Sequence, residues 1–350
     1  HWGATSQDIS DTGLVLQMRN AFNEINTLLE SLCEALAGLA ARHRNDPMAG
    51  RTFMQHALPV TFGLRAANWL APFLRHRRRL NDSMPRILTM QFSGAVGTLA
   101  SLGKDGEMVA ATLGDLLGLP VARSGWHTAR DRIGETASLL ALIAGSLNKI
   151  ATDIALLAQT EIGEVAEPGG KGRGGSSTMP QKRNPVGAAS VKASTAQVQA
   201  LAGAILANSG HDHERATGGW HTEWIMLPDI FVYTAGALER MVEICNGLEV
   251  DTDRMRANLE LTGGMIMAEA VMMALAPHIG RDQAHHEIAN ACKQAASEKR
   301  HLKDVISGLP SASALNAEQL DRIFDPTTYT GTANAQIDRV LESFNAMKTK

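Results

Sequence analysis

Aromatic residues are scarce in this chain of 350 residues: Phe, Trp and Tyr together make up 4%. Because aromatic side chains favour strands, their scarcity argues against a mainly β fold. Cysteine is scarce too, and the three copies lie far apart in the sequence, which argues against a disulfide framework. Lys and Arg nearly balance Asp and Glu at a net charge of −3, so the chain lacks the basic excess of a polyanion binder.

Long apolar runs are also missing. The longest, from Ala137 to Leu147, contains Ser and Gly and is shorter than the ~20 residues that a membrane helix needs. No basic leader followed by a cleavage site opens the chain. We therefore expect a cytoplasmic protein with no nucleic-acid or membrane partner.

The chain is instead rich in Ala, Leu and Met, which are strong helix formers. Between Asp11 and Ala41, apolar residues recur every three or four positions, which predicts a long helix capped by Asp11 or Thr12. A second helix is predicted over Pro59–Asn81. Three further segments contain so few charged residues that they predict helices buried on most sides: Asp131–Glu164, Pro185–Asn208 and Thr222–Asn246. These segments together predict an all-α fold with a long-helix bundle.

The pattern changes near residue 247. Beyond it the predicted helices are shorter and separated by turns: Asp253–Leu261, Gly264–Pro277, Asp282–Lys299 and Ala317–Phe324. We therefore expect a central bundle domain at residues 1–247 and a smaller helical domain at residues 248–350.

One polar segment, GSSTMPQKRNP at residues 175–185, places a hydroxyl (Ser176), a cation (Lys182) and an amide (Asn184) close together. A cation and an amide can hold a carboxylate that gains charge, and a hydroxyl can move a proton. From the chemistry alone, a polar loop that caps a helix is an equally good interpretation. The histidines have neither cysteine pairs nor an HExxH spacing beside them, so we expect no metal site and no cofactor.

The same segment resembles the signature of the fumarase/aspartase superfamily, G-S-S-x-M-P-x-K-x-N-P. The resemblance extends over the chain through HWGATSQD at residues 1–8, GRT at 50–52, PVTFG at 59–63 and SGAVG at 93–97. It implies a homotetramer whose active sites each draw on three subunits. It also implies a helical domain before the first motif, so we expect the natural protein to be longer.

Site residues follow from this resemblance position by position. Ser176 matches the loop serine that acts as acid or base beside the substrate carboxylate. Lys182 and Asn184 match the carboxylate-binding pair, and the same segment adds Ser177 and Met179 as substrate-binding residues. Thr5 and Ser6 match the substrate-binding Thr-Ser.

Departures from the superfamily pattern indicate which reaction to expect. Many lyases of the superfamily have His after the Thr of the second motif, whereas Phe53 follows Thr52 here and the nearest histidine is His56, which we read as helical. Trp220 and Trp224 occupy the places of the phosphate ligands of adenylosuccinate lyases, which argues against a nucleotide substrate.

Three segments instead resemble the lactone-forming cycloisomerases of the superfamily: GRTFMQHALPVTFG, GWHTEWIMLPD and GRDQAHH. This resemblance implies that an ionised carboxylate of the substrate adds to its own conjugated double bond, so that only one proton donor is needed. His127 and Arg215 would orient the substrate carboxylates, and His56 either steers a carboxylate or is structural. The alternatives are an amine-expelling lyase that releases fumarate and a non-catalytic protein of the same fold. Retention of Ser176, Lys182 and Asn184 favours an enzyme that acts on a small polycarboxylate.

Overall fold

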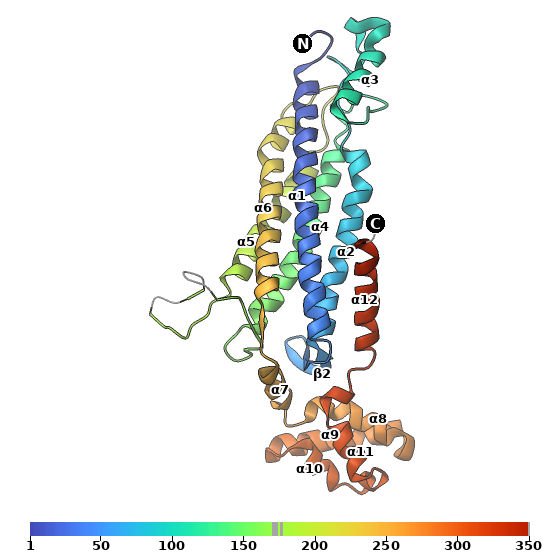
Figure 1. The fold of residues 1–350 in the computed structure, drawn as a ribbon. Helices are drawn as coiled ribbons and strands as arrows, with labels where there is room; N and C mark the ends of the chain where they lie inside the picture. Colours follow the sequence, from blue (N-terminus) through green and yellow to red (C-terminus); the bar gives the residue numbers. More distant parts are fainter. Residues whose placement is uncertain (170–173, 176–177, 349–350) are drawn as a thin grey trace. The chain divides into compact units, whose positions relative to one another are not determined.

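The computed structural model describes residues 1–169, 174–175 and 178–348, and Figure 1 shows its helices. The chain forms two compact units. The first comprises His1–Ala35, Ala71–Ala155 and Glu167–Gly247, and the second comprises Leu36–Leu70, Leu156–Ala166 and Leu248–Lys350. The expected all-α class is confirmed, since strands occupy only short segments.

The first unit is built on five long helices. Their bounds are α1 Ser6–Arg42, α2 Phe62–Ile87, α4 Asp131–Leu157, α5 Val186–Ala207 and α6 Gly219–Gly247. The parts of these helices that lie in the unit pack as a ring, and α5 runs beside α6 along its length. α1 contacts α6 through Phe22 and Phe231, and it contacts α2 through Glu30 and Arg77. α4 contacts α2 through Ser146 and His76, and its Ala141 carbonyl accepts a hydrogen bond from Gln199 of α5.

The apolar stripes predicted from the sequence form the core of this ring. Phe22, Leu29, Leu147 and Val198 are all fully buried. By length and composition α4 could cross a membrane, but half of its apolar window is buried, as in the core helix of a bundle. A short 3₁₀ helix, η1 (Ala100–Asp105), and α3 (Gly106–Leu117) lie between α2 and α4 in sequence.

The second unit contains the short elements. Its strands form two antiparallel pairs, β1 (Pro47–Thr52) with β2 (Gln55–Thr61) and β3 (Val165–Ala166) with β4 (Glu249–Val250). Its helices are α7 (Thr252–Glu260), α8 (Ala268–Ile279), α9 (Arg281–Glu298), α10 (Leu302–Ser307), α11 (Ala317–Ile323) and α12 (Ala333–Lys348). Its 3₁₀ turns are η2 (Met265–Met267), η3 (Pro310–Ala314) and η4 (Pro326–Thr328). Val271, Leu275, Ile288 and Leu302 centre its main apolar cluster.

The turn between β1 and β2 has an unusual sequence. Phe53 and Met54 occupy its two central positions with φ of 49° and 64°. A turn with positive φ at both positions usually carries Asn-Gly, because bulky side chains are strained there. Phe53 is nevertheless fully exposed, with a relative accessibility of 100%.

Three predicted helix boundaries are wrong. The first helix begins at Ser6, so Asp11 and Thr12 are not its cap but lie inside it and are buried. The second begins at Phe62, because residues 59–61 pair with β1 in the hairpin. The helix predicted over residues 131–164 ends at Leu157.

Candidate active site

Thr5 and Arg215 meet at one end of the first unit. Thr5 precedes α1, and Arg215 lies in the segment 208–218 between α5 and α6. Nη1 of Arg215 donates to Oγ1 of Thr5 at 3.0 Å, and Nη2 donates to the carbonyl of Ala95 at 2.8 Å. Ser6 is exposed beside them at the first position of α1. The structure thus brings together three of the predicted substrate-binding or motif segments.

Asp8 organises this end of the helix. Its carboxylate accepts hydrogen bonds from the main-chain N–H groups of Thr5 (2.9 Å), Ser93 (3.0 Å) and Gly94 (2.9 Å). His127, only 4% exposed, places Nε2 2.7 Å from Oδ1 of Asp8. Burial alone would raise the pKa of Asp8, but these hydrogen bonds outweigh it and hold the pKa below the usual 3.8. Asp8 is therefore ionised and holds the main chain of Thr5 in place, and His127 in turn contacts the carboxylate of Asp8.

A second buried group lies one turn along α1. Arg130, which is 2% exposed, donates to Asp11 at 2.8 and 3.1 Å and to Glu223 of α6 at 2.9 Å. Burial would lower the pKa of Arg130, but the two carboxylates raise it, so the guanidinium remains charged. The indole N–H of Trp220 also donates to Asp11, at 3.0 Å. This network fixes α1, α6 and the residue that leads into α4 relative to one another within the unit.

Lys182 and Asn184 lie at the other end of α5, just before its first residue. Lys182 is exposed, Asn184 is half-buried, and Met179 is 43% exposed. The main-chain N–H of Asn184 donates to the carbonyl of Gly174 at 2.8 Å. Ser176 and Ser177 lie outside the described residues, so their predicted roles are not tested.

Glu167 holds the base of this segment. Its carboxylate accepts hydrogen bonds from the N–H groups of Gly187 at 2.9 Å and Ala188 at 2.6 Å, in the first turn of α5. Arg183 donates to the carbonyl of Glu167 at 2.7 Å. The carboxylate therefore caps α5 from outside the helix, where unpaired N–H groups favour a negative charge.

The two clusters cannot act on one small molecule within a single chain. The 22 residues of α5 separate Asn184 from the segment that carries Arg215. At ~1.5 Å per residue, this helix is about 33 Å long. A carboxylate substrate of a few carbon atoms cannot reach both ends.

His56 belongs to the second unit. It lies in β2, not in a helix as expected from the sequence, and pairs across the hairpin with Arg51 of β1. Arg51 donates to both oxygens of the buried Glu164, at 2.9 and 2.7 Å, and Asn258 donates to the same carboxylate at 2.8 Å. Burial first, and then the charge of Arg51, lower the pKa of His56 from 6.5, so this ring is neutral near pH 7.

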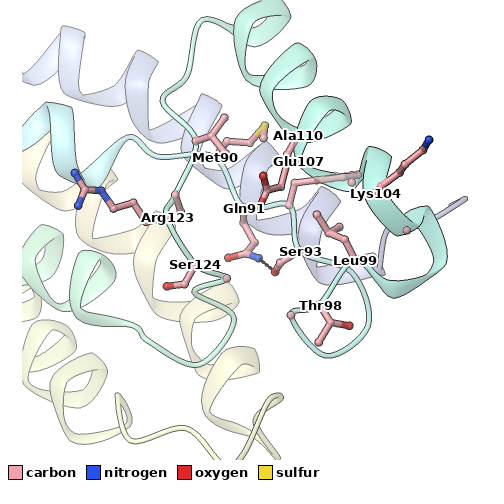
Figure 2. A pocket seen from close by; sticks show the side chains of 17 residues that line it. Met90, Gln91, Ser93, Thr98, Leu99, Lys104, Glu107, Ala110, Arg123 and Ser124 are labelled. Carbon is pink, nitrogen blue, oxygen red and sulfur yellow. Dashed lines mark hydrogen bonds between the residues drawn. The ribbon is translucent and has the colours of Figure 1, made fainter.

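A cavity of about 540 Å³ lies beside the segment that holds Asp8 (Figure 2). The amide of Gln91 points to Ser93, and Glu107 of α3 is also among the residues that line the cavity. Neither Thr5 nor Arg215 lines this cavity. The cavity therefore borders the network without containing the predicted substrate ligands.

Sequence reasoning missed Asp8, Asp11, Arg130 and Glu223. The role of Asp8 could have been predicted from the sequence, because an acidic residue three positions after a helix cap often accepts a hydrogen bond from the N–H of the cap. The roles of Arg130 and Glu223 could not, since their partners lie 119 and 93 residues away in sequence.

Comparison with known proteins gives matches over nearly the whole chain. The family described as Lyase matches residues 1–200, and the family described as Adenylosuccinate lyase C-terminus matches residues 264–340. A protein from Pseudomonas aeruginosa named 3-carboxy-cis,cis-muconate cycloisomerase is 48% identical over 348 residues, which is 99% of this chain and 76% of that protein. A protein of the same name from Acinetobacter baylyi is 49% identical over 343 residues, 98% of this chain and 76% of that protein.

Solved structures agree with these relatives. The crystal structure of 3-carboxy-cis,cis-muconate lactonizing enzyme from Pseudomonas putida matches with a TM-score of 0.94 and 46% identity. The match covers 99% of this chain and 78% of that chain. The likeness therefore includes both compact units.

Proposed function

Because this chain belongs to the fumarase/aspartase superfamily, we propose that it catalyses an intramolecular ring closure, the conversion of 3-carboxy-cis,cis-muconate to 4-carboxymuconolactone. The observation that carries the proposal is the 48% identity, over 99% of the chain, to a protein named for this cycloisomerisation. The reaction belongs to the protocatechuate branch of aromatic catabolism, and we expect the enzyme to act in the cytoplasm.

In the proposed reaction, one carboxylate of the substrate forms a C–O bond to its own conjugated double bond. The electron pair of that double bond moves onto a neighbouring carboxylate, which becomes an enediolate. The ammonium of Lys182 and the amide of Asn184 stabilise this charge, because they are donors aimed at an oxygen that gains electrons. Ser176 then delivers one proton to carbon and regains a proton from solvent, so that the product, with every carboxyl counted in its protonated form, is an isomer of the substrate.

The other predicted residues bind the remaining carboxylates. Arg215 offers a fixed cation and Thr5 and Ser6 offer hydroxyls, with Thr5 held by Asp8 and His127. Ser177 and Met179 adjoin Ser176 in the same segment. His56, neutral near pH 7, is proposed as a hydrogen-bonding group for a carboxylate and not as a cation.

Since one chain cannot unite these groups, we propose that they meet in a homotetramer whose sites each take residues from three copies. The length of α5 supports this arrangement. So does the outer face of α6, where Trp224, Ile225, Val232 and Tyr233 are 51%, 73%, 67% and 37% exposed. Exposed apolar patches of this kind are typical of surfaces that bind another protein.

An adenylosuccinate-lyase-like activity is not favoured. The two relatives described above, which are 48% and 49% identical over nearly the whole chain, carry the cycloisomerase name. In addition, Trp220 uses its N–H to bind Asp11, and neither indole can neutralise a phosphate dianion.

Two absorbance measurements test the proposal. The purified protein should consume 3-carboxymuconate, seen as loss of the diene absorbance, and should not release fumarate from adenylosuccinate. Ser176→Ala should lower turnover by orders of magnitude without changing the oligomer, whereas Ser343→Ala, at an exposed site of α12, should not. Fumarate release with no loss of diene absorbance would refute the assignment.

A further inference from the structure

His211 places a polar ring where the fold gives it no hydrogen bond. It lies in the segment 208–218 that also carries Arg215, and its side chain is 0% exposed. Among the described residues, neither Nδ1 nor Nε2 of this ring has a hydrogen-bond partner. An unpaired buried polar atom costs about 1–3 kcal/mol, so packing alone does not explain a histidine here.

The ring is closely enclosed by the buried network. Its Nε2 lies 3.6 Å from Oε1 of Glu223, slightly beyond a hydrogen bond. On the other side is Gly219, the first residue of α6, where an added Cβ would lie 2.7 Å from Cδ2 of His211. The glycine therefore makes the room that the ring occupies.

Several charged groups face His211. Burial lowers its pKa below 6.5 and Arg130 lowers it further, while Glu223, the main-chain carbonyl of His127, whose contact with the ring falls short of hydrogen-bond geometry, and Asp11 act in the opposite direction. The ring is thus neutral near pH 7. Two of its neighbours are acceptors, however, and a neutral imidazole has only one N–H whereas an imidazolium has two.

The segment that carries the ring also sets the position of Arg215. Gly210 pairs with Ala129, and Oγ1 of Thr128 donates to the carbonyl of His213 at 2.9 Å. Arg215 follows four residues after His211 and reaches Thr5 and Ala95. A shift of His211 toward Glu223 would therefore move the main chain that supports the guanidinium.

We propose that His211 is a positioning residue for Arg215, and that its protonation, with a closer contact to Glu223, tightens the binding of an anionic carboxylate at the Arg215–Thr5 pair. This inference rests on the proposed function, because it assigns Arg215 to substrate binding. The proton adds positive charge to the segment that carries the guanidinium. A polyanionic substrate favours that charge, so substrate binding and proton uptake reinforce each other.

The first test is the pH dependence of KM for 3-carboxymuconate. Between about pH 7 and pH 5, KM of the natural protein should fall on the order of threefold to tenfold, with kcat changing less. His211→Phe should raise KM at neutral pH by about tenfold and abolish its fall in acid. His211→Gln, which keeps a donor, should recover part of the neutral KM but not the pH dependence.

Gly219→Ala is the matched test, because it leaves the histidine in place and displaces its ring. It should raise KM as His211→Phe does. His285→Phe, at an exposed site of α9, is the control and should change neither KM nor its pH profile. If His211→Phe does not fold, Gly219→Ala and His211→Gln still decide the question.

Arg215→Lys separates this inference from the proposed function. If Arg215→Lys raises KM and the His211 and Gly219 variants do not, or if KM of His211→Phe keeps the natural pH profile, the role of His211 is refuted and the activity stands. If Arg215→Lys leaves KM unchanged, the binding role of Arg215 is refuted, and the inference falls with it. Absence of turnover on 3-carboxymuconate by the natural protein refutes the proposed function itself.

Discussion

The two ends of α5 hold their polar residues in different ways. At the C-terminal end, Arg215 is bound to Thr5 and Ala95, and the charged groups beneath it are buried and paired. At the N-terminal end, Lys182 is exposed, and the contacts described for Lys182 and Asn184 are main-chain hydrogen bonds. One half of the proposed site is thus arranged by folding of the chain, and the other half presents its side chains outward for use in the assembly.

The largest effect expected from this comparison is on catalysis at the exposed end. Lys182→Met should lower kcat about a thousandfold, because it removes a donor for the enediolate. The unfolding midpoint should not change, since the side chain is exposed. Steady-state kinetics and urea unfolding measure the two quantities. Lys293→Met, exposed on α9, is the control, and turnover close to that of the natural protein would show that Lys182 does not act on the substrate.

At the buried end, the main effect of a substitution should be on the free energy of unfolding. Arg130→Met leaves Asp11 and Glu223 buried without their cation, so the free energy of unfolding should fall by about 3–5 kcal/mol. Urea unfolding at a fixed protein concentration measures the loss. Arg78→Met, at an exposed site of α2, should cost almost nothing. Equal stability of the two variants would mean that the network does not stabilise this end.

Acid should destabilise the middle of the bundle at a higher pH than it affects the network. Asp8, with its pKa below 3.8, stays ionised until the pH falls through that low value. His76, whose Nε2 lies 2.8 Å from Oγ of Ser146, has a pKa lowered to about 4 by burial and by Arg79 and Arg75. Its folded-state pKa lies below its unfolded value of 6.5, so the unfolded chain binds the proton first and stability falls with the pH.

The expected loss at His76 is at most about 3 kcal/mol, all of it between pH 6.5 and pH 4. Unfolding midpoints measured across this range for the natural protein and for His76→Gln give the comparison. The variant should lose much less stability in acid. Parallel curves would assign the acid sensitivity to other groups.

The smallest effect concerns the cap of α5 at its exposed end. Glu167→Ala removes the acceptor for Gly187 and Ala188 and should cost about 1 kcal/mol. Because the same carboxylate holds the base of the segment that carries Lys182, kcat should also fall, by a larger factor than the equilibrium constant for folding does. Glu298→Ala, at an exposed helix end, is the control. An unchanged kcat would show that the cap does not position Lys182.

The sequence predicts the long helices well, because their periodic apolar residues form a buried stripe wherever the partners lie. One contiguous motif carries Lys182 and Asn184, so the sequence alone suffices to assign them a role, and that role stays a prediction. Sequence reasoning fails at Asp11, which looks like a helix cap and is instead buried against Arg130, 119 residues away. It also fails at Pro59–Thr61, where pairing with β1 decides between strand and helix. Both failures depend on contacts between segments that are distant in sequence.

The turn formed by Phe53 and Met54 has a consequence for engineering. Positive φ at two bulky residues costs on the order of 1–3 kcal/mol each, and Asn-Gly would remove that strain. We expect selection for heat resistance alone to replace this pair early. A library randomised at both positions and screened for heat resistance and for turnover would show whether the strained pair is kept for activity.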